Sequence, residues 1–196
     1  MNVIRSKVGG ENQTVATLTG GESEICRLVD RAATGDFEAF GELYSLYLDR
    51  IYRYVFYQVK DRMTAEDVTE EVFVKAWQAI DSCKGNGQTF SPWLYRIAHN
   101  QVIDNVRGHR KTISTDVDIA GDDDPELETE GKLEREGLLA AISGLSQSQQ
   151  QVIMLKFIEG MHTHQIGQIM GKSQGAVRIL QMRALARLRQ KLDKGK

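Results

Sequence analysis

Between residues 37 and 59 an apolar side chain recurs every three or four positions, at Phe37, Phe40, Tyr44, Tyr47, Ile51, Val55 and Val59. This spacing matches the period of an α-helix and would place these side chains on one face. Asp36 stands just before them, where a carboxylate can accept hydrogen bonds from the N–H groups of the first helical turn. Because no alternating apolar and polar run of useful length occurs in the sequence, the chain is expected to be all-α, with no sheet.

Two further helices are predicted in the same part of the chain. Thr64 and Asp67 have the spacing of a capping box, ahead of a helix that would bury Val68, Val72, Ala76 and Ile80. Ser91 followed by Pro92 combines a capping residue with a proline suited to the first helical position. This pair predicts a third helix from Trp93 to about Gly108, and the three helices are expected to form a bundle.

Charge is strongly segregated along the chain, although the formal net charge is only −2. Residues 116–136 contain ten acidic side chains against two basic ones, whereas residues 171–196 contain eight Lys or Arg against one acid. The start of the acidic stretch cannot bury enough apolar surface to offset its ordering entropy, so it is expected to be a flexible linker between two domains that move independently. The predicted organisation is a mobile tail over 1–23, a helical domain over 24–112, the linker over 113–133 and a second helical domain over 134–196.

The second domain contains the pattern of a helix-turn-helix. Ile166, Ile169 and Met170 predict a helix of about two turns, and Gly171 supplies the left-handed residue that ends it. Ser173 can cap a longer helix, whose core face would carry Val177, Leu180, Ala184, Leu188 and Leu192. The opposite face, with Gln174, Arg178 and Met182, would enter a DNA major groove, while neighbouring cations neutralise phosphates. A solvated basic helix of a bundle is the alternative that this pattern leaves open.

An acidic surface is predicted on the helix after Thr64, where Glu66, Asp67, Glu70 and Glu71 include pairs at i, i+4 spacing. A solvated helix face explains this spacing equally well. A di-metal carboxylate site is a third interpretation, which would make the chain an enzyme. That site usually needs Glu-x-x-His on partner helices, and the sequence contains no such motif.

The cysteine spacing, the lack of long apolar runs and the lack of known catalytic motifs exclude several classes of protein. Cys26 and Cys83 are far apart and form no C-x-x-C pair, which is typical of a reduced cytoplasmic chain. The N-terminus lacks the apolar stretch of a signal peptide, and no run reaches the roughly eighteen apolar residues of a membrane span. No P-loop, G-x-S-x-G or zinc-ligand spacing occurs. We therefore expect a cytoplasmic protein without membrane insertion, not an enzyme, with no cofactor, metal or small-molecule substrate.

Two parts of the sequence resemble a known family in the family's own order. Residues 24–112, with the segments "DFEAFGELYSLYLDRIYRYVF", "AEDVTEEVFVKAWQAI" and "FSPWLYRIAHNQVIDNVRGHRK", closely resemble region 2 of bacterial RNA polymerase sigma factors of the extracytoplasmic-function type. Residues 134–192, with "LSQSQQQVIMLKFIEGMHTHQIGQIMGKSQGAVRILQMRALARLR", resemble their region 4. The acidic linker lies between the two matches, as it does in the family.

The resemblance implies a promoter-specificity subunit, whose partners are core RNA polymerase, promoter DNA and an anti-sigma factor. Its region 2 would bind core polymerase through Asp67, Glu70, Glu71 and Phe73. It would bind the −10 element through Lys84, Asn86, Gln88, Asn100, Arg107, Arg110 and Lys111. Its region 4 would bind the −35 element through Lys172, Ser173, Gln174, Arg178, Met182, Arg183 and Arg187. The alternative function is a free-standing helix-turn-helix transcriptional regulator, which would not need a region 2.

Overall fold

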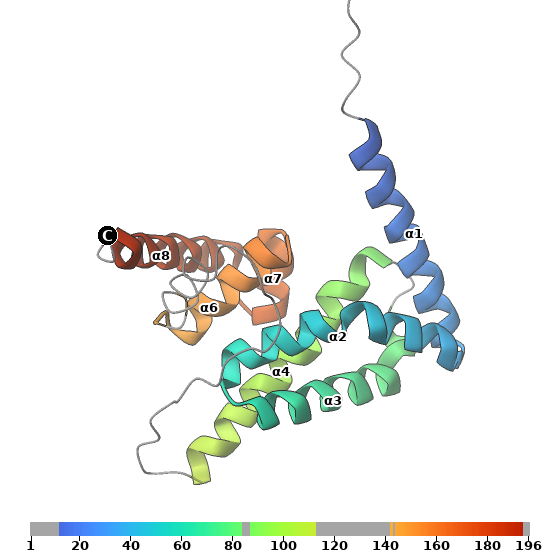
Figure 1. Ribbon diagram of the computed structural model, residues 1–196, viewed down its shortest axis with the longest axis horizontal. Coiled ribbons are helices and arrows are strands. Elements are labelled where there is room, and N and C mark those ends of the chain that lie inside the picture. The colour runs from blue at the N-terminus through green and yellow to red at the C-terminus, as the bar shows by residue number, and fades with distance from the viewer. Residues whose placement is uncertain (1–11, 84–86, 113–141, 143, 194–196) are drawn as a thin grey trace, which may run out of the picture.

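The computed structural model describes the backbone of residues 12–83, 87–112, 142 and 144–193, and the side chains of 23–83, 90–107, 142 and 144–191. Within these residues every regular element is helical, so the all-α expectation is confirmed (Figure 1). The first block comprises α1 (Asn12–Ala33), α2 (Phe37–Val59), α3 (Arg62–Ala79), the 3-10 turn η1 (Ile80–Ser82) and α4 (Gly87–Thr112). The second block comprises α6 (Gln147–Ile153), the π-helical turn η2 (Met154–Ile158), α7 (Thr163–Met170) and α8 (Gln174–Asp193). The predicted linker over 113–133 lies outside the described residues.

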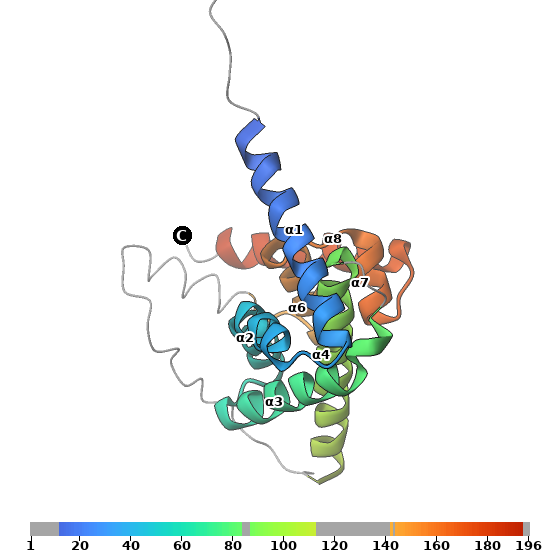
Figure 2. The same ribbon diagram turned by 90° about the vertical axis from the view of Figure 1, so that its right-hand side faces the viewer.

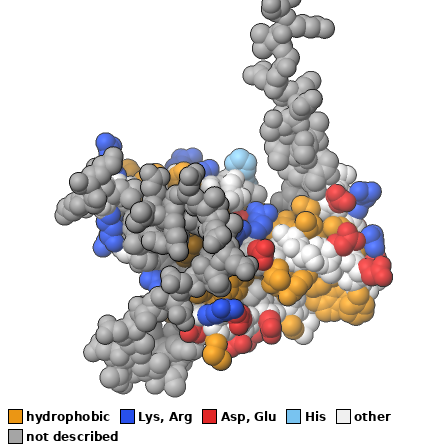
Figure 3. All heavy atoms as spheres, viewed as in Figure 1, with side chains coloured by type: hydrophobic (Ala, Val, Ile, Leu, Met, Phe, Trp, Pro, Cys, Tyr) orange, Lys and Arg blue, Asp and Glu red, His pale blue; other side chains and the backbone are white. Residues whose placement is uncertain are grey.

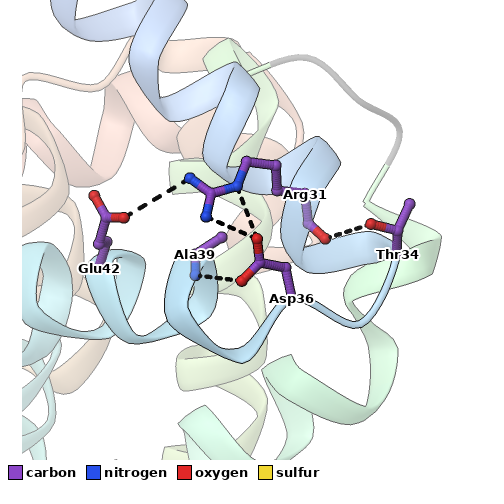
Figure 4. Close-up of polar contacts among 5 residues, drawn as sticks. All are labelled: Arg31, Thr34, Asp36, Ala39 and Glu42. Atoms are coloured by element: carbon purple, nitrogen blue, oxygen red, sulfur yellow. Dashed lines mark hydrogen bonds and ion pairs between the residues drawn. The ribbon is translucent and has the colours of Figure 1, made fainter.

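The turn between α1 and α2 is fixed by the capping residue that the sequence predicts (Figure 4). Asp36 accepts a hydrogen bond from the Ala39 N–H at 3.1 Å through Oδ1, and its Oδ2 lies 2.8 Å from Nε of Arg31. Both partners lower the pKa of the Asp36 carboxyl, the Ala39 N–H more than the guanidinium. Gly35 precedes the cap with φ +92°, a left-handed conformation that favours glycine. The helix predicted from the apolar spacing is therefore confirmed, with Asp36 as its cap.

The starts of α3 and α4 differ from the predicted ones. Asp61, not Thr64, caps α3, and its side chain accepts a hydrogen bond from the Thr64 N–H at 2.8 Å. Helix α4 begins at Gly87, so Pro92 lies inside the helix instead of at its first position. The earlier start has a packing reason: Phe90 is fully buried and meets the ring of Tyr47 at a centroid distance of 5.2 Å. Burial of that aromatic ring favours helical structure ahead of the proline.

The predicted N-terminal tail also extends too far into the chain. A mobile segment was expected over 1–23, whereas α1 begins at Asn12. Gly20 and Gly21 suggested a break, because glycine disfavours helix interiors. Further along α1, Leu28, Val29 and Ala32 are buried in the core, and this packing anchors the helix.

The two blocks share one core, which corrects the expectation that they move independently. Buried residues from α1 to α4 form a continuous apolar cluster with eight buried residues of the second block: Val152, Met154, Leu155, Met161, Ile166, Ile169, Met170 and Val177. Helix α7 packs on α4 and α6 contacts α2, and Figures 1 and 2 show the second block against these helices from two directions. A smaller cluster of Ile142, Leu145, Ile153, Ala184 and Leu188 holds α6 to α8. The two blocks therefore pack together because the first block removes the apolar face of the second block from water.

A buried ion pair crosses the boundary between the blocks. Arg50 on α2 places Nε and Nη2 at 2.9 and 2.5 Å from Oε2 of Glu159, which follows η2 and has a side chain only 3% exposed. The Arg50 guanidinium also lies over the ring of Tyr47, 5.3 Å from its centroid. Burial raises the pKa of Tyr95 at the same place, and the nearby Glu159 carboxylate raises it further. These contacts fix the geometry of the packing, which also has the apolar area of the shared cluster.

Candidate functional site

Helix α3 lies on the side of the first block away from α7 and α8 (Figures 1 and 2), and it carries exposed acidic side chains. Asp67, Glu70 and Glu71 are exposed there and line a shallow groove of about 460 Å³ together with Val74, Lys75 and Gln78. Figure 3 shows acidic side chains along the lower edge of the molecule, where α3 lies in the same view. The described part of the second block leaves this surface open to a partner.

Phe73 is not part of that surface. Its side chain is 5% exposed and packs against the ring of Tyr44, with centroids 4.7 Å apart. We therefore correct the prediction that Phe73 contacts core polymerase, because its ring is used in the core. An apolar face at i, i+4 spacing already carries Val72 and Ala76, and Phe73 lies next to it.

Exposed apolar side chains flank the acidic groove, and sequence reasoning did not select them. Val74 is 55% exposed within the groove, and Met63 is 74% exposed at the start of α3. Phe37 on α2 is 73% exposed, although its ring lies 4.4 Å from the centroid of Trp77. An apolar side chain outside the predicted core stripe was the available signal for Met63 and Val74. For Phe37 the stripe was misleading, because it placed that residue in the core.

Helix α4 carries part of the predicted −10 surface. Asn100 and Arg107 are exposed on it. Gln88, Arg110 and Lys111 belong to α4, but their side chains lie outside the described residues, as do Lys84 and Asn86 altogether. The structure therefore places two of these side chains on one helix and leaves the loop ahead of it as a prediction.

The helix-turn-helix has the capping chemistry that the sequence predicts. Gly171 ends α7 with φ 61°, and Ser173 accepts a hydrogen bond from the Ala176 N–H at 3.2 Å through Oγ. The turn is tight, because a Cβ at Gly167 would lie 2.7 Å from the Lys172 carbonyl oxygen. Glycine at that position lets the turn pack closely on α7.

Helix α8 presents its basic face to solvent. Val177, Ala184 and Leu188 are buried on the opposite side, which fixes the rotation of the helix about its axis. Basic side chains are visible over α8 in Figure 3. All seven residues predicted to contact the −35 element are exposed: Lys172, Ser173, Gln174, Arg178, Met182, Arg183 and Arg187. A face of this charge and accessibility suits the phosphates and base edges of duplex DNA.

The described residues contain neither a cluster of metal ligands nor a membrane-spanning helix. No group of three or more His, Cys, Asp or Glu in this part of the chain is arranged to hold a metal ion. His162 instead begins α7, and its N–H donates to Oε1 of Gln165 at 2.8 Å. None of the helices within the described ranges has the length and apolar character to cross a bilayer.

Comparison with known proteins identifies the family of the chain. The family description "Sigma-70 region 2" matches residues 43–112, and "Sigma-70, region 4" matches residues 141–190. Together the two matches cover more than half of the chain. The first falls on α2 to α4 and the second on the helix-turn-helix and the helices before it. A free-standing regulator would not account for the region 2 match.

The chain is also similar to curated proteins and to a solved structure. It is 34% identical over 171 residues to the ECF RNA polymerase sigma factor BldN of Streptomyces coelicolor, covering 85% of this chain and 65% of BldN. It is 29% identical over 184 residues to the ECF RNA polymerase sigma factor SigW of Bacillus subtilis, covering 87% of this chain and 98% of SigW. The structure of CnrH in complex with the cytosolic domain of CnrY matches with 25% identity and a TM-score of 0.66, covering 88% of this chain and 99% of that chain.

These matches cover both blocks in a single chain. Sigma factors are transcription initiation factors and not catalysts, so the enzymatic interpretation of the α3 carboxylates is set aside. The protein belongs to the sigma-70 family, as an RNA polymerase sigma factor of the extracytoplasmic-function type.

Proposed function

We propose that this sigma factor binds core RNA polymerase through the acidic face of α3, at Asp67, Glu70 and Glu71. The observation that carries the proposal is that these carboxylates are exposed on a helix that lies on the side of the first block away from α7 and α8 (Figure 1). Carboxylates around an exposed Val74 fit a partner surface with both basic and apolar side chains. With the exception of the N-terminal tail, the domain boundaries of the sequence analysis remain part of this proposal.

Promoter DNA is assigned to two other surfaces. The loop ahead of α4 and the exposed Asn100 and Arg107 would hold the unwound −10 element, whose bases are accessible once they leave the stack. The exposed face of α8 would read the −35 element in the major groove. Gln174 and Arg178 lie at the N-terminal end of α8, where a docked helix approaches base edges. Arg183 and Arg187 lie farther along and would contact phosphate.

The packed arrangement must open for both DNA elements to be bound at once. Helix α7 contacts α4, so the two DNA-reading units are neighbours in the described structure. Promoter positions −10 and −35 are 25 base pairs apart, or roughly 85 Å along straight B-DNA. Helix α4, with 26 residues, is only about 39 Å long. We therefore propose that the packed form is the inactive one, held by a protein partner of the anti-sigma class in the cytoplasm.

Reversal of charge on α3 tests the polymerase contact. Asp67→Lys places a cation where the proposal needs an anion, so binding to core polymerase should fall at least tenfold while helicity stays unchanged. The measurement is the affinity for core polymerase, followed by run-off transcription from the promoter upstream of the protein's own gene. Unchanged affinity and transcription would show that the α3 carboxylates form only a solvated helix face.

Two substitutions in α8 test the −35 contact within the holoenzyme. Arg178→Ala should relax base preference at one or two positions, because an arginine paired with guanine contributes about 1–3 kcal/mol of discrimination. Arg187→Ala should weaken all promoter sequences alike and reduce the salt slope of binding by about one. The opposite pattern would show that α8 is rotated about its axis relative to the proposed docking.

A further inference from the structure

The side chain of Gln101 on α4 reaches across to the polymerase-facing helix α3. It is only 6% exposed. Its Nε2 donates a hydrogen bond to Oε2 of Glu71 at 2.5 Å, and its Oε1 accepts one from Nζ of Lys75. An amide is suited to this place, because one end donates and the other accepts. One buried side chain therefore bridges a carboxylate and an ammonium group.

Glu71 and Lys75 would otherwise be expected to pair with each other. They lie four residues apart on α3, with the acid N-terminal to the base, which is the favourable order for an ion pair along a helix. The same helix shows this pairing one turn earlier, where Nε of Arg62 lies 2.9 Å from Oε1 of Glu66. At Glu71 and Lys75, unlike at Arg62 and Glu66, the amide of Gln101 hydrogen-bonds to both side chains.

The separation changes what α3 presents to a partner. Glu71 and Lys75 both line the acidic groove, next to Asp67 and Glu70. Gln101 binds Oε2 of Glu71, which leaves Oε1 and a negative charge available to a partner in the groove. A direct Glu71–Lys75 pair would neutralise that charge and would let the carboxylate turn along the helix toward Lys75.

We propose that Gln101 is a positioning residue for polymerase binding: its buried amide keeps Glu71 from pairing with Lys75 and so keeps the acidic groove of α3 ready for its partner. This inference rests on the proposed function of that groove. Gln101 belongs to α4, the helix assigned to the −10 element. One side chain would therefore link the polymerase-binding face of α3 to the DNA-binding helix.

The test compares substitutions by their affinity for core polymerase, measured with the full-length chain. Gln101→Leu removes both hydrogen bonds and keeps an apolar side chain in the core. Loss of one charge-assisted contact should weaken binding about tenfold. Adding Lys75→Ala to Gln101→Leu removes the competing cation and should restore most of the affinity. A purely structural role for Gln101 would give no such rescue. If Gln101→Leu does not fold, Gln101→Met takes its place with a closer match in length.

Two controls separate the possible outcomes. Gln58→Leu removes another buried amide, on α2 and outside the groove, and should leave polymerase affinity unchanged. Asp67→Lys tests the groove itself. Wild-type affinity of Asp67→Lys would overturn the proposed function and this inference with it. Loss of binding in Asp67→Lys, together with full binding in Gln101→Leu or no rescue by Lys75→Ala, would overturn the role of Gln101 alone.

Discussion

The two blocks of the chain differ in how they bury their apolar side chains. The first block contributes the largest fully buried side chains, Tyr54, Tyr95 and Phe90, to the shared cluster. Among its described residues, the second block has a separate core of five buried residues, Ile142, Leu145, Ile153, Ala184 and Leu188. Its remaining buried apolar residues belong to the cluster shared with the first block.

The difference indicates that the second block depends on the first more than the first depends on it. A block that opens must expose part of the shared cluster to water, at a cost proportional to the apolar area. Anything that stabilises the open form must offset that cost, as simultaneous contacts with polymerase and promoter DNA would. The predictions that follow ask how far this dependence extends, beginning with the largest expected effect.

Leu155→Ala should break the shared cluster. Leu155 is fully buried and belongs to that cluster, so its truncation should lower the free energy of unfolding by about 2–5 kcal/mol. Both tryptophans, Trp77 and Trp93, lie in the first block, so their fluorescence reports that block alone. We expect the fluorescence transition and the far-ultraviolet circular dichroism transition to shift together.

The matched control for that substitution is Leu145→Ala, in the separate core of the second block. It should shift the circular dichroism transition and leave the tryptophan transition nearly in place. Identical behaviour of the two variants would remove the distinction between a shared core and a separate one.

Glu159→Gln should loosen the boundary with a smaller effect. It leaves Arg50 without its carboxylate, and a poorly satisfied group at a partly buried site costs about 1–3 kcal/mol. Hydrogen exchange should become faster at Ile166 and Ile169 in α7 and stay unchanged in α3. Exchanging the charges, with Arg50→Glu and Glu159→Arg together, should recover part of the protection. Equal protection in the wild type and Glu159→Gln would show that the ion pair does not hold the blocks together.

Acidification should weaken the packing by the smallest amount. Burial lowers the pKa of His99 on α4, and Lys172 of the second block lowers it further. Nδ1 of His99 lies 3.5 Å from the Tyr54 hydroxyl. A freely exposed histidine titrates near pH 6.5, so the open form takes up the proton more readily than the packed form. The stabilising contribution is therefore fully present above about pH 6.5 and is lost as the pH falls through the lowered pKa.

Hydrogen exchange of α7 at pH 7.5 and pH 5.5 measures that loss. Protection should fall at the lower pH in the wild type. His99→Gln, which cannot take up the proton, should show a smaller change between the two conditions. An equal response of the two chains would assign the pH effect to other groups.

Local signals in the sequence predicted the fold well where a cap or an apolar stripe acts alone. Asp36, Gly171 and Ser173 were identified because their hydrogen bonds or backbone conformation depend on near neighbours. The start of α4 was missed, because the burial of Phe90 extends that helix ahead of Pro92. Tertiary packing overrode the local signal there.

The candidate site shows the same difference between local sequence signals and tertiary packing. Acidic residues at helical spacing predicted the exposed face of α3. Phe73 was added through the family resemblance, and its burial against Tyr44 depends on where α2 lies. Gln101 had no signal at all, since its partners are 26 and 30 residues away. The Arg50–Glu159 pair spans 109 residues and was equally inaccessible to local reasoning.

The most direct test of the account is the distance between the blocks during transcription. Spin labels at Asp30 on α1 and Gln190 on α8, both exposed, would be placed in a chain whose native cysteines are replaced by serine. In the free protein we expect one narrow distance distribution, set by the packed arrangement. In the complex with core polymerase and promoter DNA, the distance should increase by tens of ångströms, because the two promoter elements are roughly 85 Å apart. The same distance distribution in a complex that makes transcript would contradict the account.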